Sequence, residues 1–243
     1  MRISILGFAL LAACALPTND TDEPFSPPGK GDAVTDLRER IHAYVTDNSI
    51  ALSYYDARQA MFGVTASFDI HDGAVECVYT GKRAQPDGTN TPGGFNTEHS
   101  WPQSQGAEQE PPRSDLHHIF PVDEAANSAR ASFPFGTAAC ATRDPDTCAW
   151  HAGGSALDQT TPTTAVFEVR PERRGDIARA HFYFAVRYDL MIPNDEEAVL
   201  RAWNEADPPD ALEAARDEGI FAIQHNHNPF IQWPELVDDI ADF

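Results

Sequence analysis

Apolar residues recur at intervals of three or four positions in several segments of this chain. In the first of these segments, Val34, Leu37, Ile41 and Val45 would share one face of a helix, because an α-helix turns once every 3.6 residues. Acidic residues mark the beginnings of several other segments, as is typical of helix N-termini. The helices predicted in this way cover about residues 34–45, 49–62 (a helix or a helical turn), 122–131 and 176–190, a segment from Asp195 that includes Leu200 and Trp203, and one from Asp207 or Asp210 to about Ile223.

Few segments have the character of strands. Ala66–His71 and Ala74–Thr80 are separated by Asp72-Gly73, a dipeptide that is typical of tight hairpin turns. Residues 164–170 form a third strand-like run. The segments predicted as loops, residues 81–115 and about 137–162, are rich in glycine, proline and small polar residues. Helices around a small β element with long loops indicate an α+β fold, and we expect one domain over residues 34–243.

The first residues predict an export signal. Residues 1–13 (MRISILGFALLAA) carry a single charge, at Arg2, followed by about eleven apolar residues. That run is shorter than the roughly 20 residues of a membrane-spanning helix, but it suits the hydrophobic region of a signal peptide. The sequence Leu11-Ala12-Ala13-Cys14 resembles a bacterial lipobox, in which the cysteine is lipidated. Cleavage nearby without lipidation is the alternative.

Residues 14–33 are predicted to be the lipidation site and a disordered tether, because proline, glycine, aspartate and threonine dominate the segment and no apolar period occurs. The expected location is therefore the outer membrane or the cell surface. Periplasmic or secreted protein is the alternative.

The cysteines agree with an oxidising compartment. Cys140 and Cys148 flank a turn-prone loop, and we expect a disulfide between them. Cys77 lies in a strand-like segment and is expected to be a buried thiol. A bridge from Cys77 to either of the others stays open, because sequence alone does not fix connectivity.

Charge changes the picture of the partners. Among 243 residues, 38 are acidic and 17 are basic, so the formal net charge is -21. The 42% hydrophobic content excludes a disordered polyanion. So negative a chain has no broad attraction for phosphate or anionic lipid, although a local basic groove is compatible with it. The cations that could form such a groove are Lys82, Arg83, Arg113, Arg130, Arg170, Arg173 and Arg174.

Candidate chemistry is concentrated in residues 95–104 (FNTEHSWPQS), residues 114–121 (SDLHHIFP) and the residues just after them. Glu98 and Asn127 offer a carboxylate and an amide oxygen, which suit Mg²⁺. His99 is a candidate general base near neutral pH. A metal ion with a histidine that activates water can hydrolyse a phosphodiester. Arg130 would share a helix face with Asn127 and could bind the phosphate.

These motifs, together with residues 127–136, resemble the endonuclease I family of secreted or periplasmic DNases, and the resemblance covers about residues 37–237. It implies a ββα-metal (His-Me finger) core around one Mg²⁺ ion, with Mn²⁺ or Ca²⁺ as substitutes. In that pattern Glu98 and Asn127 match the metal ligands and His99 matches the general base. The implied activity is cleavage of DNA, and in some members of RNA, to 5′-phosphate products by a monomeric enzyme.

Other residues receive supporting roles. Asp115, His117 and His118 are expected to orient the site or to contact DNA, and Arg113 and Arg174 are candidate DNA contacts. Trp101 is expected to be a core residue, and His225-Asn226-His227 a structural segment rather than a metal site.

Two other functions stay open. One is a metal-dependent phosphodiesterase that acts on small or other extracellular substrates, which need less basic surface. The other is a surface lipoprotein that binds metal or DNA without catalysis, although that function would not explain the adjacent Glu98 and His99.

Overall fold

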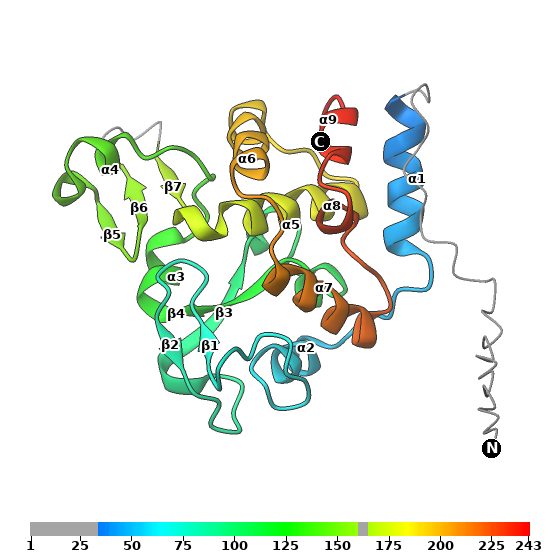
Figure 1. Ribbon diagram of the computed structural model, residues 1–243, viewed down its shortest axis with the longest axis horizontal. Coiled ribbons are helices and arrows are strands. Elements are labelled where there is room, and N and C mark those ends of the chain that lie inside the picture. The colour runs from blue at the N-terminus through cyan, green and yellow to red at the C-terminus, as the bar shows by residue number, and fades with distance from the viewer. Residues whose placement is uncertain (1–33, 160–164) are drawn as a thin grey trace, which may run out of the picture.

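The computed structural model describes residues 34–159 and 165–243. The predicted signal, Cys14 and the predicted tether lie outside the described residues. In the part that is described, no helix has both the length and the apolar character that a membrane span requires. The architecture is α+β, as predicted, with helices gathered beside small antiparallel sheets (Figure 1).

One helix forms the centre of the molecule. α5 (Arg174–Arg187), which runs across the middle of Figure 1, is buried along almost its whole length and packs against α1, α6 and α8. The remaining helices are α1 (Val34–Thr46), α2 (Tyr54–Met61), α3 (Glu124–Arg130), α4 (Ala139–Arg143), α6 (Asn194–Ala206), α7 (Ala211–Gln224), α8 (Pro229–Gln232) and α9 (Leu236–Asp239).

The longer helices confirm the periodicity of the sequence. Leu37, Ile41 and Val45 of α1 are all buried. α7 begins after Asp210, whose carboxylate accepts hydrogen bonds of 2.8 Å from the backbone N–H groups of Leu212 and Glu213. Asp210, and not Asp207, therefore caps this helix.

The strands of residues 34–159 and 165–243 form three separate antiparallel sheets: β1 (Val75–Glu76) with β2 (Arg83–Ala84), β3 (Phe95–His99) with β4 (Ile119–Asp123), and β5 (Trp150–Ala152), β6 (Ser155–Asp158) and β7 (Val166–Glu168) in that order. In the second sheet, Glu98 lies opposite Phe120 and His99 opposite Ile119. The Asp123 side chain then accepts a hydrogen bond from Ala126 N and caps α3. The chain thus runs strand, strand, helix through the candidate motifs.

The prediction that residues 95–99 lie in a loop was wrong. Asn96, Glu98 and His99 are weak strand formers, and the partner strand contains Pro121, a residue that normally argues against a strand. The pairing joins residues from 20 (His99 with Ile119) to 28 (Phe95 with Asp123) positions apart, so no local pattern reveals it. The β5–β6 hairpin was missed for a related reason, because its signal is mainly the Gly153-Gly154 turn.

The predicted hairpin over residues 66–80 was also wrong. The Asp72-Gly73 turn exists, with φ values of 48° and 76°, but it joins only one bridge, between His71 and Ala74. The residues before it turn towards α7 instead. There Asp69 Oδ1 accepts a 2.7 Å hydrogen bond from Arg216 Nε, so a tertiary ion pair replaces the strand ladder.

The expected disulfide joins Cys140 to Cys148, and Cys77 is a buried free thiol. The bridge closes a short loop with a sequence separation of 8 residues. In the chain-entropy model such a loop stabilises the folded state by about 2–3 kcal/mol. We therefore expect Cys140→Ser with Cys148→Ser to lower the free energy of unfolding by that amount in urea denaturation. A loss below about 0.5 kcal/mol would contradict this, and Cys77→Ala is the control for thiol removal.

Candidate active site

Glu98 is held by two buried side chains. Only 1% of Glu98 is exposed, and its Oε1 accepts a 2.7 Å hydrogen bond from the Tyr79 hydroxyl and lies 3.2 Å from Arg130 Nε. Burial raises the pKa of Glu98 to about 7, while Arg130 and the Tyr79 hydroxyl oppose that shift. Within the described residues no hydrogen bond engages the second oxygen, Oε2. One carboxylate oxygen is therefore fixed and the other is left for a ligand.

Asn127 offers a second oxygen from the neighbouring helix. Its Nδ2 donates to Asn96 Oδ1 at 2.7 Å and to the Thr97 carbonyl at 3.1 Å. Both bonds lead to the strand that carries Glu98, so the amide of α3 is tied to β3. They use the Asn127 nitrogen, and its Oδ1 accepts no hydrogen bond from the described residues.

This donor set fits a hard divalent cation. A carboxylate oxygen and an amide oxygen without protein partners are the ligands that Mg²⁺ uses when water and substrate phosphate complete its coordination. A nearby cation would also favour the ionised form of Glu98. No group of three His, Cys, Asp or Glu side chains in residues 34–159 and 165–243 could hold a metal. A site here would therefore rely on Glu98, Asn127 and solvent.

His99 is poised as a neutral base. Its Nε2 lies 3.0 Å from the Arg113 carbonyl oxygen, which can only accept, so the proton sits on Nε2 and Nδ1 carries the lone pair. Burial lowers the pKa of His99 to about 4; the charges of Arg113 and Arg58 add to this, and the bond to the Arg113 carbonyl opposes it. The imidazole is therefore uncharged at neutral pH. Gln103 Nε2 lies 3.1 Å from Nδ1 and thus takes the position that a water molecule to be deprotonated would occupy.

Neither His117 nor His118 can contact DNA in this conformation. His118 is fully buried, its Nε2 bonds the Pro112 carbonyl at 2.7 Å, and its ring packs 5.5 Å from that of His99 and 4.3 Å from that of Phe184. Burial lowers its pKa to about 3. Of the two expected roles, the structure favours orienting the site.

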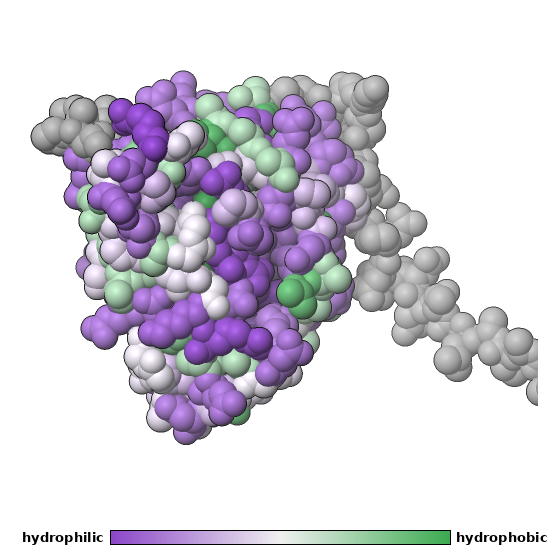
Figure 2. Space-filling model, turned by 60° about the vertical axis from the view of Figure 1, so that its left-hand side comes forward, coloured by the Kyte–Doolittle hydropathy of each residue, from purple (hydrophilic) through white to green (hydrophobic). Residues whose placement is uncertain are grey.

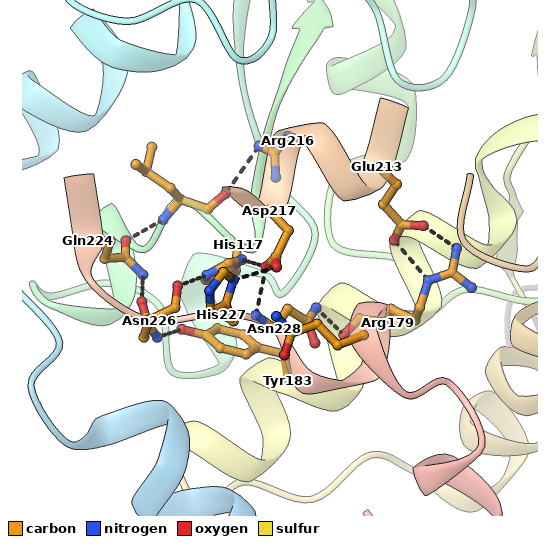
Figure 3. A network of polar contacts seen from close by, with 12 residues as sticks. His117, Arg179, Tyr183, Glu213, Arg216, Asp217, Gln224, Asn226, His227 and Asn228 are labelled. Atoms are coloured by element: carbon orange, nitrogen blue, oxygen red, sulfur yellow. Dashed lines mark hydrogen bonds and ion pairs between the residues drawn. The ribbon is translucent and has the colours of Figure 1, made fainter. Parts of the chain in front are cut away.

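His117 belongs to a polar network between the segment before β4 and the C-terminal end of α7 (Figure 3). Its Nε2 lies 2.9 Å from the Asn226 carbonyl, and its Nδ1 lies 3.8 Å from Asp217 Oδ1. Asp217 also binds His227 Nδ1 at 2.7 Å and Asn228 N at 2.8 Å. Asn226 and His227 therefore help to fasten the C-terminal segment, as expected for a structural segment.

Asp115 is the buried centre of a second network. It accepts hydrogen bonds from Tyr183, Tyr188 and Gln224 at 2.8–3.0 Å and lies 3.1 Å from Arg187 Nη1. Burial raises its pKa, but the Arg187 guanidinium and the hydrogen bonds outweigh that effect and lower it to about 2. Asp115 thus ties the loop that contains Arg113 to α5 and α7.

The structure revises the role expected for Arg130. The side chain is fully buried, and its guanidinium faces Glu98, the Ser100 carbonyl at 2.8 Å and the Phe135 ring at 4.6 Å. It does not face solvent, where it would meet a substrate phosphate. In this conformation Arg130 positions Glu98 rather than binding phosphate.

Most of the other candidate cations are already neutralised. Arg174 pairs with Glu168, and Arg170 and Arg173 both pair with Glu76. They therefore do not form the free basic groove that the sequence allowed. Arg113 differs, because its guanidinium lies 4.3 Å over the ring of Tyr54.

Three residues near the site were not singled out from the sequence. Tyr79 lies nineteen positions before Glu98, and Tyr54 and Arg58 lie in α2, outside the motifs. Their side chains reach the site only through folding, and no local pattern could have identified them. Trp101, by contrast, is the expected core residue, 5% exposed and stacked on Phe184.

Comparison with known proteins identifies a nuclease family and nucleases that are similar to this chain. A family model described as Endonuclease I matches residues 35–235. An extracellular ribonuclease of Bacillus amyloliquefaciens is 32% identical over 251 aligned positions, which cover 94% of this chain and 81% of that protein. An extracellular deoxyribonuclease of Aeromonas hydrophila is 29% identical over 123 positions, or 49% of this chain and 48% of that protein. A periplasmic deoxyribonuclease of the same species is 28% identical over 123 positions, or 49% of this chain and 47% of that protein.

Proposed function

Because this chain belongs to the endonuclease I family, we propose that it is an exported, Mg²⁺-dependent endonuclease that hydrolyses phosphodiester bonds of DNA and RNA with little sequence preference. One observation carries the proposal. Within the part of the chain that the structure describes, Glu98 Oε2 and Asn127 Oδ1 accept no hydrogen bond. They belong to the neighbouring elements β3 and α3, and the neutral His99, whose lone pair is on Nδ1, directly follows Glu98. We assign residues 34–243 to the nuclease domain, with the site at β3, β4 and α3.

The chain's own residues supply the base and its orientation. The Arg113 carbonyl holds the His99 Nε2 proton, so Nδ1 carries the lone pair that takes a proton from water, once a water molecule replaces Gln103 Nε2 as the donor to that lone pair. That water attacks phosphorus and the bond to the 3′ oxygen breaks. The departing 3′ oxygen takes a proton from solvent, the phosphate stays on the 5′ oxygen, and His99 returns its proton to solvent. Tyr79 and Arg130 keep the Glu98 carboxylate in place. A bound Mg²⁺ would supply positive charge for the phosphoryl oxygens as negative charge develops on them.

Activity should require the metal. We expect the purified protein to nick supercoiled plasmid and to shorten RNA in Mg²⁺, to lose both activities in EDTA, and to regain them when excess Mg²⁺ is added. Gel electrophoresis of the products and end-labelling of the 5′ phosphate would measure this. Intact plasmid and RNA over a range of salt and pH, with the protein shown to be folded, would refute the proposal.

Tyr79 offers a separate test of the ligand site. Tyr79→Phe removes the hydroxyl that fixes Glu98 Oε1 and leaves only Arg130 to hold the carboxylate. Removal of a residue that orients a metal ligand typically weakens metal binding by about 10–100-fold. Calorimetric titration with Mg²⁺ would measure the loss, and Tyr44→Phe, whose hydroxyl bonds Gln232 near the surface, is the matched control. Equal affinities in the two variants would argue against Glu98 as the ligand.

The net charge favours a second candidate function. A chain with a charge of -21 repels a long polyanion more than it repels a small diester. Turnover of a model phosphodiester without cleavage of DNA or RNA would identify a small-molecule phosphodiesterase with the same catalytic residues.

Export is supported by relatives that are named as extracellular or periplasmic nucleases. Lipidation at Cys14 is part of the proposal. Mass spectrometry of the mature N-terminus would show acylated Cys14, and Cys14→Ser should release the protein from the membrane fraction.

A further inference from the structure

Two arginines beside the candidate site lack the partners that most other arginines of this chain have. Within the described residues, carboxylates pair with most arginines, among them Arg38, Arg83, Arg130, Arg170, Arg173, Arg174, Arg179, Arg187, Arg201 and Arg216. Within residues 34–159 and 165–243, Arg58 and Arg113 form no ion pair. Arg58 donates one hydrogen bond, to the Asn90 carbonyl at 2.8 Å. The Nε atoms of both residues are buried without a hydrogen-bond partner.

Both guanidiniums lie against one aromatic ring. The Cζ atoms of Arg113 and Arg58 are 4.3 Å and 5.5 Å from the centre of the Tyr54 ring. That ring lies 5.5 Å from the ring of His99, and the Arg113 carbonyl bonds His99 directly. The aromatic ring therefore holds two positive charges next to the proposed general base.

A carboxylate that contacts this cluster does not neutralise it. Glu110 Oε1 accepts a hydrogen bond from the Tyr54 backbone N–H at 2.6 Å and forms no ion pair with either arginine. A partly desolvated guanidinium without an anion is costly. In a chain with 38 acidic residues, two such groups against one aromatic ring indicate a place reserved for an anionic ligand.

We propose that Tyr54, Arg58 and Arg113 form a binding site for the phosphodiester backbone of the nucleic acid, next to the bond that His99 hydrolyses; this rests on the proposed function. Arginine binds phosphate oxygens in a two-pronged geometry, and stacking on an aromatic ring preorganises it. Local binding of this kind lets a very acidic protein hold a polyanion. Hydrophilic residues cover much of the face drawn in Figure 2.

The salt dependence of binding tests this site without requiring catalysis. Binding of a fluorescent DNA duplex and of a single-stranded RNA would be measured in EDTA at increasing salt for Arg58→Gln, Arg113→Gln and the double variant. Each lost phosphate contact should reduce the slope of log affinity against log salt by about 0.9 on duplex DNA and about 0.7 on a single strand. On the duplex, the double variant should lose about 1.8. Arg143→Gln, an exposed arginine of α4, is the matched control and should keep the wild-type slope.

Lysine variants separate charge from geometry. Arg58→Lys and Arg113→Lys should keep the wild-type slope but bind several-fold more weakly, because lysine lacks the planar fork. They also keep the test decisive if a glutamine variant fails to fold, which thermal unfolding would reveal. Wild-type slopes in the glutamine variants, or unchanged affinity in the lysine variants, would overturn the inference. If the wild-type protein still cleaved DNA or RNA, the proposed function would stand. A wild-type protein that neither binds nor cleaves DNA or RNA would overturn both.

Discussion

His99→Ala should lower the rate of DNA and RNA hydrolysis by about two to four orders of magnitude, the usual contribution of a general base. The reason is geometric. The Arg113 carbonyl fixes the Nε2 proton of His99, so Nδ1 is the atom that can accept a proton from water, and alanine offers no replacement. Initial rates of plasmid nicking in Mg²⁺ would measure the loss.

Two further variants make that result interpretable. His99 is largely buried, so His99→Gln, which leaves a smaller cavity, should lose activity to a similar extent while circular dichroism reports the native fold. His151→Ala, at a more exposed histidine in β5, should retain wild-type activity. A loss of only a few-fold in both His99 variants would exclude His99 as the base.

Asp115→Ala should lower the free energy of unfolding by about 3–5 kcal/mol, the usual cost of removing one partner of a buried ion pair. Asp115 receives hydrogen bonds from Tyr183, Tyr188 and Gln224 as well as facing Arg187. The variant would leave the Arg187 charge buried without its carboxylate. Urea denaturation at neutral pH would measure the change.

The pH dependence provides a second measure of the same carboxylate. In the folded protein its pKa is about 2, below the value of about 3.9 in an unfolded chain. The stabilising contribution is therefore complete above about pH 4 and is lost as the pH falls towards 2. The difference in stability between the wild type and Asp115→Asn should shrink over that range.

An exposed aspartate gives the control for both measurements. Asp146 has an 89% exposed side chain and lies 3.4 Å from His151. Surface pairs of this kind contribute about 0–1 kcal/mol, so Asp146→Asn should change stability little. An Asp115→Ala protein as stable as this control would show that the buried network is not needed to hold the loop.

Features encoded within a few neighbouring residues were predicted best from the sequence. The helices around α5 follow an apolar period of 3.6 residues, and Asp210 caps α7 from within its own turn. The short spacing of Cys140 and Cys148 made their disulfide the simplest pairing. The strands were predicted less well than the helices. β3 exists only through its pairing with β4, and Asp69 forms an ion pair with Arg216 of α7 instead of taking part in a hairpin.

The features of the candidate site also fall into two groups, those that the sequence predicted and those that only the structure revealed. The sequence by itself determined the α+β class, through the apolar periods of its helices. Its ordered motifs determined the family resemblance and the choice of Glu98, His99 and Asn127. Only the tertiary structure decided that Arg130 is buried against Glu98 and that His117 and His118 face inward.

The tertiary structure also brought together residues that the motifs do not contain. Tyr79, from the segment after β1, donates its hydroxyl hydrogen bond to Glu98. The ring of Tyr54, in α2, lies against His99 and against the guanidiniums of Arg58 and Arg113. The physical reason is the range of the interactions. Helix periods, caps and short loops are encoded within a few residues, whereas burial, ion pairing and the surroundings of a catalytic group depend on packing between segments far apart in the chain.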